Sequence, residues 1–133
     1  TLTEESVMRR DRFYFMLEGG PMGGEDEAYP LVDLLVTPQE VCLLAEVPGV
    51  PRQALDLKIE EDRVEIRGRR CEPEFFAKAT HFYKLESFYG FFERRITLPV
   101  EVEPRDVKVD LSDGVLRIRI PRRRPKVIEI PVK

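Results

Sequence analysis

Apolar and polar residues alternate along most of the chain after residue 30, and the clearest example is the stretch 115–121. Large aliphatic side chains recur there at every second position, which is the period of a half-buried strand. These positions are Leu116, Ile118 and Ile120. Asp113 and Gly114 come just before and supply the positive φ of a tight hairpin turn. Pro121 lacks the N–H that continues a ladder, so the pattern predicts a last strand that ends there.

Similar β-like stretches precede this hairpin. They are Leu31–Val36, Val41–Val47, Leu55–Glu60, Val64–Arg67, Gly90–Pro99 and Val107–Leu111. Turn residues such as Pro38, Gly49 and Gly68 separate them, and most recur about every 9 to 11 residues, the spacing of antiparallel sandwiches. We therefore predict an all-β fold, an immunoglobulin-like antiparallel β-sandwich.

The segment 69–89 breaks this rhythm, because it is long for a connection within a sandwich and such loops are usually functional. Inside it, residues 81–87 alternate like a strand that has no sequence neighbour to pair with. We predict that this strand pairs with a sheet edge of another subunit, so that protomers exchange strands. Its residues are His81, Phe82, Tyr83, Lys84, Leu85 and Glu86. The alternative is a surface hairpin that packs on its own domain.

One charged residue falls on an apolar face. Arg94 shares a face of its predicted strand with Phe92, Ile96 and Leu98. A buried charge without a partner is costly. We therefore expect a carboxylate or carbonyl partner for Arg94, and we place this residue at the interface formed by strand exchange.

The first 28 residues differ from the rest and are predicted to be a flexible N-terminal arm and linker. The linker is rich in glycine. The arm carries an apolar patch without a clean period, made of Phe13, Tyr14, Phe15, Met16 and Leu17. A short helix over 4–17 fits the sequence as well as an irregular arm does. We expect this patch to contact partner subunits or unfolded clients.

A flexible tail over residues 122–133 follows the domain, which we predict to span 29–121. Ile128, Ile130 and Val132 alternate there among prolines and have too little sequence around them to form a core. Such a segment is suited to add as a strand to the edge of another sheet, with its side chains filling alternate pockets.

Composition narrows the class of protein. The chain has 133 residues, of which 35% are charged and 42% hydrophobic, and its net charge is −3. An acidic balance argues against nucleic acid as a partner, so we interpret the basic run Arg122–Arg124 as a solvated spacer. No apolar run approaches the 18 or so residues of a membrane-spanning helix. The chain begins with Thr1, so we expect that some N-terminal sequence was removed or is not included.

Candidate chemistry is sparse, and we expect no enzyme, no metal and no cofactor. Cys42 and Cys71 are the two cysteines of the sequence, too few for a disulfide framework, so a reducing cytoplasm is expected. His81 is the single histidine, and a zinc site or a nucleophilic pair with Cys71 is the weaker interpretation. No glycine-rich phosphate loop is present. The acidic run Glu60–Asp62 is interpreted as a turn between strands.

Five short motifs follow one another in order. They are Ala45-Glu46-Val47-Pro48-Gly49-Val50, the hairpin Leu55–Gly68, Phe92-Glu93-Arg94-Arg95-Ile96-Thr97-Leu98-Pro99, Ser112-Asp113-Gly114-Val115-Leu116 and Ile128-Glu129-Ile130. Together they resemble the α-crystallin domain and C-terminal motif of small heat shock proteins. Val109 stands where many members have alanine and Ile96 where most have an aromatic residue, and both remain apolar. The long 69–89 segment resembles bacterial and plant members, whose dimers exchange that strand.

The resemblance implies a holdase chaperone that binds partly unfolded proteins without ATP and works as dimers assembled into a larger, exchanging oligomer. It also implies that Ile128 and Ile130 of one chain fill an apolar groove on a neighbour. The groove residues are Leu55, Leu57 and Ile59 on one edge strand and Val107, Val109 and Leu111 on another. Two alternatives remain open at this point: a co-chaperone-type sandwich domain that docks on one defined protein, and a sandwich module that binds carbohydrate or another ligand.

Overall fold

Seven antiparallel strands in two sheets make up the core of the computed structural model, which describes residues 29–124 and 129–132. The strands are β1 (Val32–Val36), β2 (Glu40–Glu46), β3 (Leu55–Ile59), β4 (Arg63–Arg70), β5 (Gly90–Thr97), β6 (Lys108–Ser112) and β7 (Val115–Pro121), and the short 3-10 helices are η2 (Arg52–Ala54), η3 (Glu74–Lys78) and η4 (Pro104–Asp106). Among these residues there is no α-helix. The predicted all-β sandwich is confirmed.

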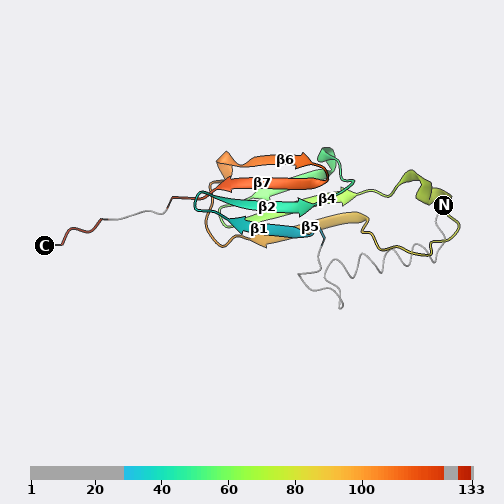
Figure 1. Ribbon diagram of the computed structural model, residues 1–133, viewed down its shortest axis with the longest axis horizontal. Coiled ribbons are helices and arrows are strands. Elements are labelled where there is room, and N and C mark those ends of the chain that lie inside the picture. The colour runs from blue at the N-terminus through green and yellow to red at the C-terminus, as the bar shows by residue number, and fades with distance from the viewer. Residues whose placement is uncertain (1–28, 125–128, 133) are drawn as a thin grey trace.

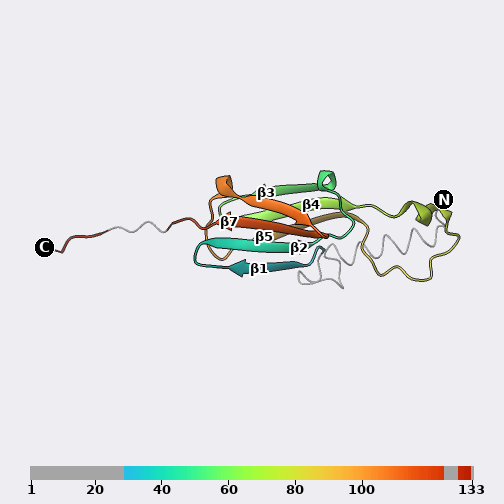
Figure 2. The ribbon, with the colours of Figure 1, turned by 45° about the horizontal axis from the view of Figure 1, so that its top comes forward.

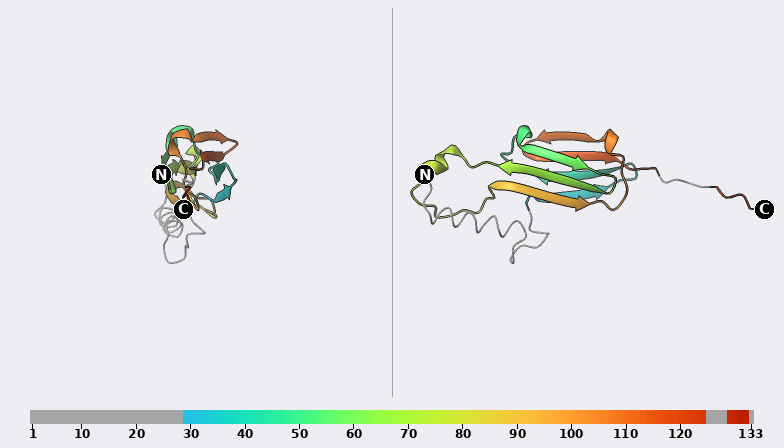
Figure 3. Two further views of the ribbon diagram at one scale, coloured as in Figure 1. Left: turned by 90° about the vertical axis from the view of Figure 1, so that its left-hand side faces the viewer. Right: turned by 180° about the vertical axis from the view of Figure 1, so that it is seen from behind.

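The two sheets differ in width. One has the order β1-β2-β7-β6 and the other β3-β4-β5, and the narrower sheet lies in front when the molecule is seen from behind (Figure 3). The edge strands β3 and β6 follow the same side of the sandwich (Figure 2). The other two edge strands, β1 and β5, follow the opposite side (Figure 1).

The core lies between the sheets and is built from every second residue of the central strands. In β2, burial alternates from Val41 to Ala45, and in β7 the predicted inward residues Leu116, Ile118 and Ile120 are all buried. Register brings Leu43 opposite Ile118, and both side chains are inaccessible to solvent. The alternating pattern therefore identified the buried faces correctly.

The last hairpin forms as its sequence predicts. Asp113 and Gly114 have φ angles of 53° and 77°, and the Gly114 carbonyl accepts a hydrogen bond from the Val47 N–H at 2.7 Å. Strand β7 ends at Pro121. Backbone hydrogen bonds nevertheless continue for two more residues, since the N–H of Arg122 donates to Gln39 and that of Arg123 to Glu101. Arg122 and Arg123, interpreted as part of a solvated spacer, are accessible to solvent at their side chains, while their backbone continues the pairing of the sandwich.

Strand β4 is longer than the sequence suggested, because it passes through Gly68 and ends at Arg70. A glycine weakens a strand signal, which is why Gly68 was interpreted as a boundary. The structure leaves no room for a side chain at Gly68. A Cβ at this position lies 2.5 Å from the Phe92 ring and 2.8 Å from the Ala54 carbonyl oxygen. Phe92 thus fills the space above the glycine on the neighbouring strand.

The long segment between β4 and β5 projects beyond the end of the sandwich opposite to the end where Arg122 leaves it (Figure 1). It contains η3, but the predicted strand over 81–87 does not form in the single chain. An extended segment needs a neighbouring strand for its backbone hydrogen bonds, and no strand of the described residues pairs with this one. Pairing with another subunit therefore stays a prediction.

Candidate assembly surfaces

The groove predicted for the tail corresponds to the β3 and β6 side of the sandwich. Most of its residues are half-buried and pack against the core, namely Leu55, Leu57, Ile59, Val107 and Leu111. Val109 is the exception. It is opposite the buried Ile118, so it faces inward, yet 45% of it is exposed. An inward-facing side chain that stays accessible marks a place where the narrower sheet fails to cover the wider one.

Because one sheet has four strands and the other three, the inner face of β1, at the side of the sandwich opposite to β6, is also uncovered. Leu34 and Val36 are opposite the buried Leu43 and Val41, so they too face inward. They remain 37% and 41% exposed. Among the strands of the described residues, β1 pairs with β2 alone, so its other edge has no strand partner there. A free edge with apolar side chains is a ready template for another strand. The sequence pattern does not predict this surface, because an uncovered inner face follows from the widths of the two sheets, which no pattern along one strand contains.

The 71–89 segment carries aromatic side chains that contact one another. Phe76 lies at its centre, with edge-to-face contacts to Phe75, Phe82 and Tyr89 at centroid distances of 5.6, 5.2 and 5.2 Å. Phe75 and Tyr83 are 67% and 91% exposed. Of the residues predicted for strand exchange, Phe82 and Leu85 are half-buried, and the others from His81 to Glu86 are exposed. The segment therefore presents apolar surface that its own sandwich leaves uncovered.

Arg94 has the carbonyl partner expected for a charge on an apolar face. Its Nη1 donates a hydrogen bond of 2.9 Å to the carbonyl oxygen of Pro30, a fully buried residue just before β1. The guanidinium thus ties the entry of β1 to β5 on the side where β1 is free. Its role at an interface between subunits remains a prediction.

Replacing Arg94 is expected to be more damaging than replacing its neighbour. Arg94→Met leaves the Pro30 carbonyl without its charged donor, so we expect the free energy of unfolding to fall by about 1.5–3 kcal/mol. Arg95→Met is the matched control, because Arg95 lies on the opposite, exposed face and pairs with Glu93 at 2.7 Å. Its effect should stay below about 1 kcal/mol. Urea unfolding of both variants at one protein concentration measures the difference, and equal losses would contradict the assignment.

Near Arg94, residues at the two ends of the 71–89 segment lie close to Tyr29, the first described residue. Tyr29 stacks on Phe88 at 4.6 Å and contacts Phe92 edge-on at 5.1 Å. Arg70 donates a hydrogen bond to the Phe88 carbonyl at 3.3 Å, and its guanidinium lies over the Tyr89 ring. Within residues 29–124 and 129–132, no hydrogen bond meets the geometric limits at the buried Tyr29 hydroxyl, although Arg70 lies close to it. Burial raises the pKa of Tyr29 above its usual value, and the nearby Arg70 charge opposes this shift.

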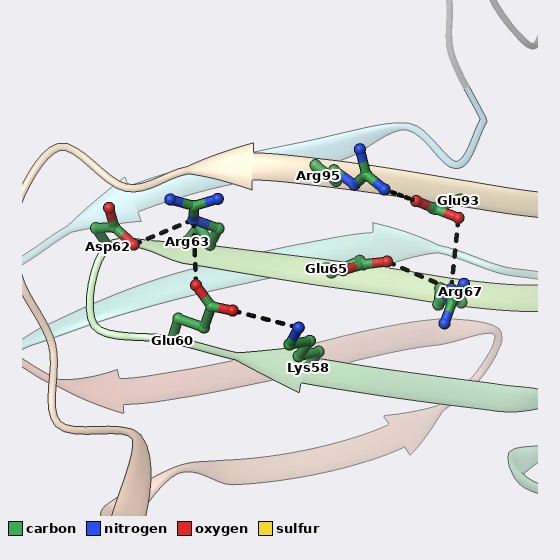
Figure 4. Close-up of polar contacts among 8 residues, drawn as sticks. All are labelled: Lys58, Glu60, Asp62, Arg63, Glu65, Arg67, Glu93 and Arg95. Atoms are coloured by element: carbon green, nitrogen blue, oxygen red, sulfur yellow. Dashed lines mark hydrogen bonds and ion pairs between the residues drawn. The ribbon is translucent and has the colours of Figure 1, made fainter.

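The outer face of the narrower sheet is a network of ion pairs (Figure 4). Glu93 lies between Arg95 and Arg67, at 2.7 and 3.4 Å. Glu60 is likewise paired with one cation on each side, at 3.4 and 3.3 Å. The residues drawn are Lys58, Glu60, Asp62, Arg63, Glu65, Arg67, Glu93 and Arg95. Charges of these eight residues neutralise one another, so this part of the face presents no one-signed field to a partner.

Several predicted residues lie outside the described part of the chain. These are the arm patch, Phe13, Tyr14, Phe15, Met16 and Leu17, and the first tail isoleucine, Ile128. Ile130 and Val132 are described and are 79% and 98% exposed. The tail isoleucine that can be observed is therefore not buried by its own chain.

Chemical sites are not found in the described ranges. Over residues 29–124 and 129–132, no group of three or more histidine, cysteine, aspartate or glutamate side chains is placed to hold a metal ion. Cys42 and Cys71 are free thiols. No helix within those ranges is long and apolar enough to cross a membrane.

Comparison with known proteins connects these surfaces to one family. A family model for the Hsp20/alpha crystallin family matches residues 33–133. Small heat shock protein C4 of Rickettsia felis is 34% identical over 94 residues, covering 71% of this chain and 57% of that protein. This chain spans about three fifths of the length of the curated relatives it matches.

Two solved structures are also similar. The hspA protein of Xanthomonas axonopodis is 31% identical with a TM-score of 0.62, and the alignment covers 71% of this chain and 93% of that one. A small heat-shock protein from Xylella fastidiosa is 29% identical with a TM-score of 0.61, over 77% of this chain and 96% of that one.

Proposed function

The chain belongs to the Hsp20/alpha crystallin family, the small heat shock proteins, and from this premise we propose that it is an ATP-independent holdase chaperone. It binds partly unfolded proteins and keeps them from aggregating, and it has no catalytic step. The observation that carries the proposal is the apolar surface left open at both sides of the sandwich. Val109 at one side and Leu34 and Val36 at the other face inward and are exposed.

Two segments of the chain are suited to these two surfaces. The tail isoleucines Ile128 and Ile130 have the period-two spacing that fills alternate pockets beside an edge strand. The 81–86 segment can pair with the free edge of β1 in a second copy, which gives both protomers the backbone hydrogen bonds they lack. A dimer formed by exchange and linked by tails builds a larger oligomer. The Xylella fastidiosa relative is described as having a distinct high order structure, which supports a larger assembly here.

Weak, repeated contacts make such an assembly suitable for capturing clients. One tail contact is expected to be weak, because ordering the tail offsets much of its apolar burial. Many contacts in one particle hold it together by avidity. Subunits that leave transiently expose the two apolar surfaces and the arm patch 13–17 to clients. The net charge of −3 and the two free thiols support a cytoplasmic protein that does not act on nucleic acid.

The test is suppression of client aggregation without nucleotide. A heat-labile enzyme that contains tryptophan is heated with increasing amounts of this protein, and light scattering is followed. We expect scattering to fall steeply as the ratio approaches one subunit per client. Because this sequence has no tryptophan, client tryptophan emission reports on the client alone and should show that the held enzyme is not native.

Serum albumin at equal mass is the control for nonspecific crowding. Unchanged aggregation at equimolar protein would reject the holdase. That outcome would instead favour the alternative of a co-chaperone-type domain that docks on one defined partner.

A further inference from the structure

The chain does not leave the sandwich freely after β7. Arg122 forms a bridge with Val102, and its Nη1 donates a hydrogen bond of 3.1 Å to the Thr37 carbonyl. The carbonyl of Pro121 accepts from the Glu103 N–H at 2.8 Å. The first residues of the tail are thus bound on two sides, by the β1–β2 turn and by the loop between β5 and β6.

Arg123 is held by three carboxylates from different parts of the sequence. Its Nη1 lies 3.0 Å from Glu61 and 3.4 Å from Glu101, and its Nε lies 3.4 Å from Glu103. Its backbone N–H also donates to the Glu101 carbonyl at 2.9 Å. Glu61 belongs to the turn between β3 and β4. The arginine therefore connects the exit of the tail to both sheets at the end of the sandwich where their turns meet.

Anchoring at Arg123 limits where the tail can bind. Four residues lie between Arg123 and Ile128, so the five Cα–Cα steps from one to the other reach at most about 18 Å. The predicted groove between β3 and β6 begins at the end of the sandwich where Arg123 is held. Strand β3 ends there at Ile59, two residues before Glu61, and β6 begins there after η4, which contacts β7. The backbone of residues 122–124, held by these contacts, heads away from the sandwich (Figure 1).

We propose that Arg123 is a positioning residue that directs the tail away from its own groove and toward the groove of a second copy of this chain. The carboxylates of Glu61, Glu101 and Glu103 are the counter-ions that hold it. All four side chains are 40–63% exposed, so the anchor is sensitive to salt, which screens exposed pairs. This inference rests on the proposed docking of Ile128 and Ile130 and adds to it the element that selects between chains.

The test uses Arg123→Gln, with Arg124→Gln as matched control. Arg124 is exposed and has no ion pair with the described residues, and its loss changes the charge by the same amount. Subunit exchange is measured by mixing two fluorescently labelled populations. We expect exchange to be about threefold to tenfold faster for Arg123→Gln than for wild type, and unchanged for Arg124→Gln. Arg123→Lys, which keeps the charge but loses the forked geometry, should lie between.

Salt response separates an anchor from a general loss of structure. Raising the salt to about 1 M shortens the screening length to about 3 Å, so exchange should speed up in wild type and in Arg124→Gln and change little in Arg123→Gln. Melting curves of the three proteins should overlay. If Arg123→Gln matches Arg124→Gln in rate and in salt response while I128A/I130A still breaks the assembly, the anchor is wrong and the docked tail stands. If I128A/I130A leaves the assembly intact, the proposed docking itself fails.

Discussion

The double variant I128A/I130A is expected to lose the larger assembly and to sediment as a dimer or smaller species. Burying each isoleucine is worth about 1.5–3 kcal/mol, or about 3–6 kcal/mol per tail before the cost of ordering is subtracted. Alanine keeps little of this, so each contact should weaken roughly 100-fold or more. Ile130 is 79% exposed in its own chain, and the change should therefore leave the folded sandwich intact.

Sedimentation velocity over a range of concentrations measures this effect. Val132→Ala is the matched control, because Val132 continues the same alternation but lies beyond the isoleucine pair and is 98% exposed. It should keep the assembly. On the receiving side, Val109→Asp places a charge at the uncovered position of β6 and should reproduce the double variant. A wild-type mass for I128A/I130A would rule out the tail as the link between dimers.

The substitution Gly68→Ala is expected to be the most destabilising small change in the sandwich. The added methyl group lies 2.5 Å from the Phe92 ring and 2.8 Å from the Ala54 carbonyl oxygen. The ring is buried and packed against Tyr29 and Phe88, so it has little room to move. Overpacking of this kind typically costs about 1–3 kcal/mol and occasionally more. We expect about 3 kcal/mol, since a backbone atom is involved as well as a ring.

A double-mutant cycle with Phe92→Leu tests the cause. Leucine is smaller than the ring, so Gly68→Ala should cost clearly less in the Phe92→Leu background than in wild type, with a coupling above about 0.5 kcal/mol. The free energy of unfolding in urea is the readout. Additive losses would mean that the ring is not what excludes a side chain at this position, and the contact with Ala54 would then carry the whole effect.

Much of the fold could be predicted from local pattern. The inward residues of β7, the turn at Asp113 and the need of Arg94 for a polar partner all follow from properties of short segments. The extension of β4 through Gly68 could not, because the residue that allows it is one that usually marks a break. The strand over 81–87 was predicted from alternation alone, yet alternation provides no partner for its hydrogen bonds.

The surfaces depended on contacts between distant parts of the sequence. Arg123 resembled part of a solvated basic run because its partners Glu61 and Glu101 lie 62 and 22 residues away. The acidic turn at Glu61 likewise looked unremarkable by itself. Leu34 and Val109 face inward and stay exposed because a four-stranded sheet packs on a three-stranded one. The number of strands in each sheet cannot be inferred from any single segment.

The ion-pair face of the narrower sheet has a consequence for warm conditions. Hydration of charged groups becomes less favourable as temperature rises, because it carries a strongly negative entropy, so linked pairs lose less to competing water. Glu93 and Glu60 each pair with two cations. Because the cost of desolvating these charges falls on heating, we expect the pairs to stabilise the packing of β3, β4 and β5 more in warm conditions. The sheet that would form one wall of the proposed tail groove is thereby stabilised at its outer surface at temperatures where other proteins begin to unfold.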